Sequence, residues 1–323
     1  LKGLKLELDF KVGDLETDVK SLKKAARQNV SPEITKRINQ IIEGKQIELK
    51  ENRKIYWNNF PIAILAKGAD YLSPELNLII DDIVENNEKL KLHSFLKKWV
   101  DTKIADELDS LFKLKNINSV NSQIRALSYQ LYENNGVVKR EEVLNIVNSL
   151  SQDERKTLRN LGVKFGRYHI FLFKLFKPSV VSLRILLWKN FKGEDLNLFP
   201  PTFGLNFVND LKYRNKKFML LCGFEKFDNF FVRIDILERL FIEIINSNEN
   251  KSDKIKLLPK MLNLLGCDKE SFVKVIKLMG YKVFDEKNET FFKYKPFKKI
   301  KKSLDLKIKK DNPFEALKQL DLK

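Results

Sequence analysis

The spacing of apolar residues predicts a mostly helical chain with short β elements between the helices. Apolar residues recur every three to four positions over long stretches, which is the period of one buried helix face. One helix has clear ends, because Ser31 can act as its N-cap, Pro32 fits its first position and Gly44 follows its end. A short basic helix over Lys20–Gln28 precedes it, so residues 1–45 should be helical.

Short runs of β-forming residues replace the helical period between Ile47 and Ala66. Asn58-Asn59 can form a turn between two of these runs. We therefore expect a small β unit over residues 46–72.

A helical domain is expected over residues 73–192. Ser73-Pro74-Glu75 signals a helix start, and the helical period continues from there to about Leu114. Residues 192–204 contain proline and glycine and are a candidate domain boundary. Further helices are predicted over Ile124–Glu133, over Lys139–Leu150, over Arg155–Leu161 after a capping box at Ser151–Glu154, and from Pro178 onward.

A second helical domain is expected over residues 205–294, and its end has the element order of a winged helix. A helix over Val232–Asn246 comes first, followed by helices over Ile255–Leu265 and Glu270–Met279 and by a hairpin over residues 281–294. Asp268 can act as the N-cap of the helix over Glu270–Met279. A looser version of this order occupies residues 124–173. Because helix pairs with a hairpin also occur in folds that bind nothing, the winged-helix-like units are a hypothesis.

The C-terminal residues 295–323 combine a basic tail with a terminal helix. Lys295–Lys310 is rich in lysine and has little apolar period, so a flexible tail is expected. Asn312-Pro313-Phe314 then opens a short amphipathic helix that ends near Leu320. Such a helix usually docks on its own core or on a partner.

The charge of the chain is strongly positive. It has 61 Lys and Arg residues against 43 Asp and Glu residues, a formal net charge of +18 at pH 7. A polyanionic partner explains this excess most simply. The alternative is a composition bias of the genome, since Lys far outnumbers Arg, and Asn and Ile are abundant.

The sequence offers little for catalysis or metal binding. Two cysteines and two histidines are scattered along the chain and do not predict a zinc site. The only Gly-Lys pair, Gly44-Lys45, is followed by Gln46, so the chain has no P-loop, and it has no DExH box. The adjacent Asp81 and Asp82 would point to different sides of a helix, which fits a solvated face. We predict no catalytic residue and no metal site.

Membrane insertion is not expected either. No apolar run approaches the roughly 20 residues of a membrane span, and no signal-peptide pattern opens the sequence. A cytoplasmic location is therefore expected.

The segment Gly162–Lys177 is the strongest candidate for nucleic-acid binding, because basic and aromatic residues are interleaved in it. Cations neutralise phosphates, and aromatic rings stack on unpaired bases. The alternative is that its aromatic residues belong to a core and that only its cations face solvent. The predicted contact residues, including one on the next helix and four in the tail, are Lys164, Arg167, Tyr168, His169, Lys174, Lys177, Arg184, Lys298, Lys299, Lys301 and Lys302.

Five sequence blocks carry a resemblance to a known family. The most specific is GVKFGRYHIFLFKLFKPSVVSLRILLW (Gly162–Trp188). Together the blocks resemble, in the same order, the C-terminal accessory region of a bacterial ATP-dependent helicase family related to the RNA helicase of the mitochondrial degradosome. The other four blocks are IYWNNFPIAILAKGADYLSP (Ile55–Pro74), GFEKFDNFFVRIDILERL (Gly223–Leu240), LLGCDKESFVKVIKLMGYKV (Leu264–Val283) and NPFEALKQL (Asn312–Leu320).

The resemblance implies an RNA-binding accessory region that guides a strand during unwinding. The helicase motor domains of the same full-length protein would be its partners and would bind ATP and Mg²⁺, so this chain alone should have no cofactor and no ATPase activity. Residues 1–45 would connect to the motor, and the sequence that starts at Leu1 would be a fragment. RNA is the expected ligand, DNA is an alternative, and an RNA-degradation protein is a candidate partner.

Two other functions fit the same sequence. One is a stand-alone winged-helix protein that binds nucleic acid without a motor. The other is a protein-docking scaffold, in which the helix over residues 313–320 would be the docking element and the charge would reflect composition bias.

Overall fold

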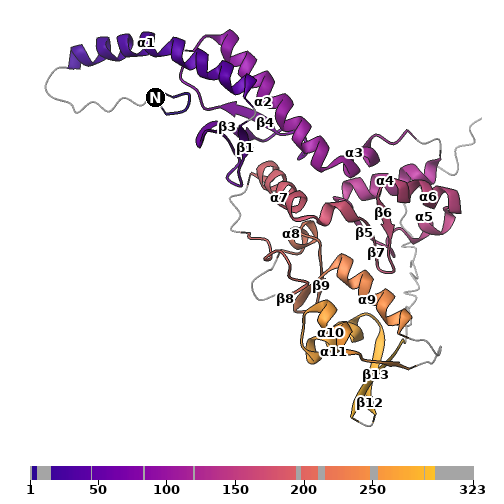
Figure 1. Cartoon of the computed structure of the whole chain (residues 1–323). Coiled ribbons are helices and arrows are strands. Elements are labelled where there is room, and N and C mark those ends of the chain that lie inside the picture. Colours follow the sequence, from indigo (N-terminus) through magenta and orange to yellow (C-terminus); the bar gives the residue numbers. More distant parts are fainter. Residues whose placement is uncertain are drawn as a thin grey trace, which may run out of the picture.

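In the computed structural model, helices are joined to small antiparallel sheets (Figure 1). This confirms the coarse prediction of helices with small β elements, although strands take a larger share than a mainly helical chain implies. None of the described helices is long and apolar enough to cross a membrane. The predicted tail and terminal helix lie outside the described residues, which are 2–5, 16–44, 46–82, 84–118, 121–193, 198–209, 215–247, 254–286 and 288–294.

A four-stranded antiparallel sheet with strand order β1-β2-β3-β4 lies at the centre of the N-terminal part. The turn predicted at Asn58-Asn59 is confirmed, with φ angles of 46° and 66° that Asn adopts more readily than most residues. Helices α1 (Glu16–Glu43) and α2 (Asn86–Glu107) lie side by side next to this sheet (Figure 1). The strands are β1 (Ile47–Leu49), β2 (Lys54–Trp57), β3 (Phe60–Ala66) and β4 (Glu75–Leu78).

Helix α1 is continuous where the sequence predicts a break at Ser31 and Pro32. Pro32 lies inside the helix, although a proline there removes one backbone hydrogen bond and crowds the preceding turn. Ile34, Ile38 and Ile41 follow at helical spacing and are fully buried, so core packing outweighs the local signal. The predicted end of this helix before Gly44 is confirmed.

The helix start predicted at residues 73–75 is wrong. Glu75–Leu78 is strand β4, which pairs with β3. Leu76 is buried between exposed neighbours, and this alternation is the period of a strand. Helix α2 begins only at Asn86, and the short helix α3 (Asp109–Lys115) follows it. The boundary expected at residue 72 therefore falls inside the sheet.

Three successive segments then repeat one order of elements: a helix, a strand, one or two short helices and a hairpin. In each repeat the first strand pairs with the last one, so the sheet orders are β5-β7-β6, β8-β10-β9 and β11-β13-β12. The first repeat comprises α4 (Ser122–Glu133), β5 (Val137–Lys139), α5 (Leu144–Ser149), α6 (Gln152–Asn160), β6 (Val163–Phe165) and β7 (His169–Leu172).

The 3-10 helix η1 (Phe173–Phe176) leads into the second repeat. That repeat comprises α7 (Pro178–Lys192), β8 (Phe207–Asn209), α8 (Lys216–Leu221), β9 (Phe224–Phe227) and β10 (Phe230–Arg233). The third comprises α9 (Ile234–Asn246), β11 (Ile255–Lys256), α10 (Pro259–Leu265), α11 (Lys269–Leu278), β12 (Tyr281–Glu286) and β13 (Glu289–Tyr294).

Three predicted helices in these repeats begin too early. Lys139, Val232 and Ile255 each lie in a strand, and the helices α5, α9 and α10 start later. These strands have only two to four residues, so they are too short to produce a period of their own. The predicted caps are confirmed, since the capping box at Ser151 is complete and Asp268 caps α11.

Helix α7, the first helix of the second repeat, contributes to two hydrophobic cores because it is buried on both sides. Leu183, Leu186 and Leu187 belong to the core that also contains the four-stranded sheet and the first repeat. Val181 and Ile185 belong to the core of the second repeat. The third repeat packs around a further core, built from α9, α10, α11 and the last hairpin together with Phe230 and Val232 of β10.

Candidate nucleic-acid interface

The predicted basic and aromatic segment, residues 162–177, forms β6, β7 and η1; its lysines and Arg167 are exposed, whereas its rings range from the buried Phe171 to Phe173, which is 51% exposed. Lys164, Arg167, Lys174 and Lys177 are exposed, and Tyr168 is half-buried. Phe171 is buried and stacks on Phe176 with ring centroids 5.3 Å apart. Part of this aromatic content therefore belongs to the interior, as the alternative interpretation expects. The predicted contacts at Lys298, Lys299, Lys301 and Lys302 lie outside the described residues.

Arg184 is fully buried. Its guanidinium donates hydrogen bonds to the carbonyl oxygens of Asn135, at 2.6 Å, and Leu175, at 3.3 Å. Burial lowers the pKa of Arg184 to about 10. These bonds join α7 to the end of α4 and to η1. Because Arg184 has no exposed surface, we remove it from the predicted nucleic-acid contacts.

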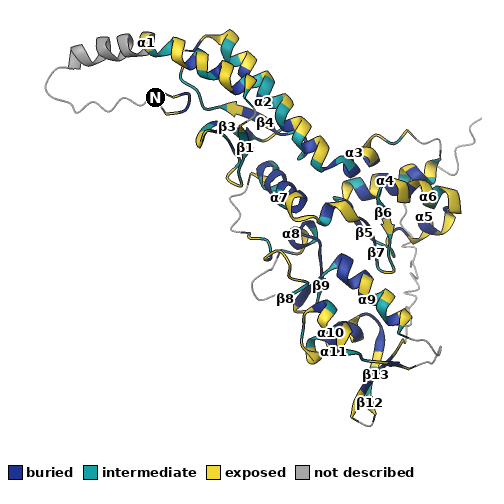
Figure 2. Ribbon diagram, in the orientation of Figure 1, coloured by how far each residue is buried: buried dark blue, intermediate teal, exposed yellow. Residues whose placement is uncertain are grey.

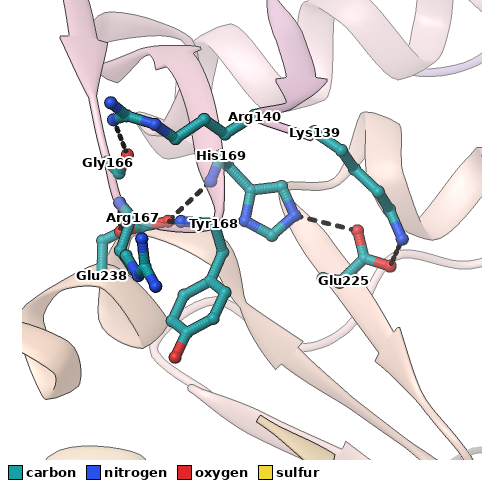
Figure 3. A network of polar contacts seen from close by, with 8 residues as sticks. All are labelled: Lys139, Arg140, Gly166, Arg167, Tyr168, His169, Glu225 and Glu238. Atoms are coloured by element: carbon teal, nitrogen blue, oxygen red, sulfur yellow. Dashed lines mark hydrogen bonds and ion pairs between the residues drawn. The ribbon is translucent and has the colours of Figure 1, made fainter. Parts of the chain in front are cut away.

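His169 is also removed from these contacts, because it is only 3% exposed. Its Nε2 lies 3.0 Å from Oε2 of Glu225, and Lys139 Nζ lies 3.1 Å from Oε1 of the same carboxylate (Figure 3). The Nδ1 atom lies 3.6 Å from Oε1 of Glu238. We call Lys139, His169, Glu225 and Glu238 the buried polar cluster. It joins strands of the first repeat to β9 of the second and α9 of the third.

Glu238 holds the turn between β6 and β7. Its carboxylate accepts hydrogen bonds from the backbone N–H groups of Arg167, of Tyr168 at 2.9 Å and of His169 at 2.8 Å (Figure 3). A Cβ atom on Gly166 would lie 2.3 Å from the carboxyl carbon of Glu238, so only glycine permits this approach. Arg140 fixes the same turn from the other side, by donating to the Gly166 carbonyl at 2.8 Å.

The charges of the buried polar cluster stabilise one another. Burial opposes the charged form of His169, but its contacts with Glu225 and Glu238 outweigh this and raise its pKa above the ordinary value. Burial likewise opposes the charged form of Glu225, but His169 and Lys139 lower its pKa. The histidine is therefore favoured as a cation between two carboxylates, as expected for buried charges that are paired.

A cleft of about 460 Å³ opens beside this cluster, and residues of all three repeats line it. We call it the junction cleft. The cations along its walls are Lys139, Arg140, Arg167 and Lys226. Two acidic residues, Glu141 and Glu225, line it as well, but Glu225 is already paired with Lys139 and His169.

Aromatic rings accompany these cations. Tyr168, Phe227 and Tyr294 line the junction cleft, and Tyr294 is 43% exposed. The Arg167 guanidinium donates to the Tyr294 hydroxyl at 3.3 Å and lies 5.9 Å from the Phe241 ring centroid. Cations beside partly exposed rings can bind phosphates and stack on bases. Among the described residues, no group of His, Cys, Asp and Glu could hold a metal ion.

Sequence analysis missed most residues of this site. Lys139, Arg140 and Lys226 lie in separate strands and turns, and only the folded chain brings them to one cleft. Glu238 carries a signal that could have been used, since it and Asp235 are acidic residues among the buried apolar residues of α9. A carboxylate at such a position needs a partner.

Comparisons of this chain with protein-family models, with curated proteins and with solved structures find no match.

Proposed function

We propose that this chain is an RNA-binding accessory region that works beside an ATP-driven helicase motor. The observation that carries the proposal is the junction cleft, where cations from the first and second repeats meet partly exposed aromatic rings. A strand in this cleft would place phosphates near Arg167 and Lys226. The net charge of +18 supports the same ligand class, because it favours association with polyanions.

The order of elements supports winged-helix-like units as the binding modules. A helix, a strand, two helices and a hairpin, with the first strand beside the last, occur in the first and third repeats. A winged helix has this helix and hairpin order, and one of its helices can contact nucleic acid. Exposed cations on the corresponding helices, Lys156 on α6 and Lys274 and Lys277 on α11, fit that use.

The motor itself would lie in another part of the same protein. This step of the proposal rests on the five sequence blocks that resemble the helicase family. ATP and Mg²⁺ would act in the motor, while this chain would hold the strand on which the motor pulls. RNA is the proposed ligand, and an RNA-degradation protein is a proposed partner.

Substitution of cleft cations tests the proposal. The double variant Arg167→Gln with Lys226→Gln should bind single-stranded RNA more weakly than the unchanged chain in fluorescence anisotropy. Because two phosphate contacts would be lost, the slope of log K against log salt should become shallower by about 1.4.

A matched control removes the same charge elsewhere. Lys36 on α1 and Lys98 on α2 are exposed residues of the N-terminal part, so Lys36→Gln with Lys98→Gln should leave the slope unchanged. Equal losses in both double variants would show that only net charge matters and would contradict a site in the cleft. If the chain binds no RNA at low salt, the proposed function is wrong.

A further inference from the structure

The last hairpin presents a second basic and aromatic surface. In β12 and β13, Lys282 pairs with Lys293, Phe284 with Phe291, and Glu286 with Glu289. Side chains alternate between the two faces of a sheet, so these three pairs share one face. The other face carries Phe292, Tyr281 and Val283, which pack in the core of the third repeat. We call the face that carries the Lys282–Lys293, Phe284–Phe291 and Glu286–Glu289 pairs the outer face.

The outer face is open to solvent. Lys282, Lys293, Glu286 and Glu289 are exposed, and both phenylalanines are half-buried. The hairpin projects from the rest of the described chain, and its tip residues are exposed (Figures 1 and 2). Lys256 of the neighbouring strand β11 lies opposite Phe291 and belongs to the same face.

The charges on the outer face favour an anion as its ligand. Glu286 and Glu289 at the tip pair with Lys254 and Lys256. Lys282 and Lys293 lie directly opposite each other nearer the body, where both could contact the same backbone phosphate.

The two phenylalanines lie beside these lysines, and Lys254 Nζ lies 5.2 Å from the ring centroid of Phe284. Their ring centroids are 6.3 Å apart and their planes differ by 15°. A cross-strand aromatic pair also stabilises a hairpin by itself. Stabilisation of the hairpin would not by itself require the two rings to lie next to an exposed pair of lysines. Every base has a face that can stack on such rings.

We propose that the outer face is a stacking platform for single-stranded nucleic acid. Lys282 and Lys293 would bind backbone phosphates, and Phe284 and Phe291 would stack on unpaired bases. This inference rests on the proposed function and adds a second surface, apart from the junction cleft, at which unpaired bases are recognised as well as phosphates. Duplex RNA, whose bases are already stacked, would gain nothing from the rings.

The test compares two oligonucleotides of equal length and charge. One is a single-stranded 12-mer of uridine, and the other is a 12-mer of abasic sites with the same phosphate backbone. The unchanged chain should bind the base-containing strand at least about five-fold more tightly. The variant Phe284→Leu with Phe291→Leu keeps an apolar cross-strand pair but loses the flat rings, so most of this preference should be lost while its affinity for the abasic strand stays constant.

Two further variants separate stacking from other effects. Lys282→Gln should weaken binding of both strands equally, because it removes a phosphate contact. Tyr129→Leu removes an aromatic ring that is 61% exposed on α4, far from the hairpin in sequence, and should preserve the preference.

The outcomes distinguish this inference from the proposed function. If the leucine variant keeps the preference for bases, or if the unchanged chain has none, the stacking platform is wrong while salt-sensitive RNA binding stands. If neither strand binds at low salt, both proposals fail, and the outer face would instead be tested as a protein-docking surface.

Discussion

The first and last hairpins occupy the same place in their repeats but have opposite surroundings. In the β6–β7 hairpin, Glu238 accepts hydrogen bonds from three backbone N–H groups of the turn. In the β12–β13 hairpin, the tip projects into solvent (Figure 2). The same local topology therefore forms a contact between repeats in one case and an exposed surface in the other.

This difference shows that composition alone does not locate a binding surface. The segment with the clearest basic and aromatic pattern, residues 162–177, contributes much of its length to a joint between repeats. The hairpin over residues 281–294 has a weaker pattern but a freer surface. Four substitutions or changes of conditions sharpen this contrast.

The largest effect is expected from removing the carboxylate that holds the first hairpin. Glu238→Ala leaves three N–H groups without their acceptor, that of His169 buried and those of Arg167 and Tyr168 part-buried, and takes one carboxylate from His169. Because it breaks a buried ionic network, the free energy of unfolding should fall by about 3–5 kcal/mol in chemical denaturation. The exposed Glu51 offers a control, and Glu51→Ala should change it by less than about 0.5 kcal/mol. A loss below about 1 kcal/mol for Glu238→Ala would contradict the claim that this carboxylate holds the β6–β7 hairpin in place.

A smaller loss is expected from crowding the same contact. Gly166→Ala would place a methyl group 2.3 Å from the carboxyl carbon of Glu238, and overpacking of this kind costs about 1–3 kcal/mol. The double variant with Glu238→Ala removes the clash. In the Glu238→Ala background, Gly166→Ala should lower the free energy of unfolding by clearly less. Equal losses with and without Glu238 would show that the clash with its carboxylate does not cause the destabilisation.

The pH dependence of stability should report the buried polar cluster. The pKa of His169 is raised in the folded chain, so its contribution is fully present below its unfolded pKa of about 6.5 and is lost as the pH rises through the folded pKa. The pKa of Glu225 is lowered, so its contribution is present above about pH 4.5 and is lost as the pH falls through the folded pKa.

Thermal unfolding from pH 4 to 9 measures this dependence. In the unchanged chain, stability should decline as the pH rises above about 6.5. His169→Gln should remove this decline, because glutamine does not titrate. A decline of the same size in the variant would assign it to other groups.

The smallest effect is expected at the tip of the last hairpin. Asn288 has a φ of 61° and is exposed. Glycine adopts this conformation without strain but costs more entropy on folding, so Asn288→Gly should change the free energy of unfolding by no more than about 0.5 kcal/mol. A loss as large as that of Gly166→Ala would mean that this tip is held as firmly as the first hairpin.

Local signals in the sequence predicted much of the secondary structure. The capping box at Ser151, the cap at Asp268 and the turn at Asn58-Asn59 act within a few residues, so they can be recognised without the fold. The predictions failed where pairing with a distant segment decides the outcome. Strand β4 forms because it pairs with β3, and α1 continues through Pro32 because the isoleucines that follow it are buried.

The candidate site was predicted less completely than the fold. The pattern of residues 162–177 correctly indicates exposed cations such as Lys164 and Arg167, but it cannot separate them from the buried His169. That distinction depends on Glu225 and Glu238, which lie more than fifty residues further along the chain. The three-fold repetition was also missed, since the strands that define it are mostly three or four residues long.

The salt dependence of RNA affinity tests the central claim most directly. Fluorescence anisotropy of the whole chain with a single-stranded RNA, titrated at several salt concentrations, gives the slope of log K against log salt. The proposed function predicts binding at low salt. It also predicts a negative slope, whose size is about 0.7 for each phosphate contact that the chain makes. Absence of binding at low salt, or an affinity that salt does not change, would contradict it.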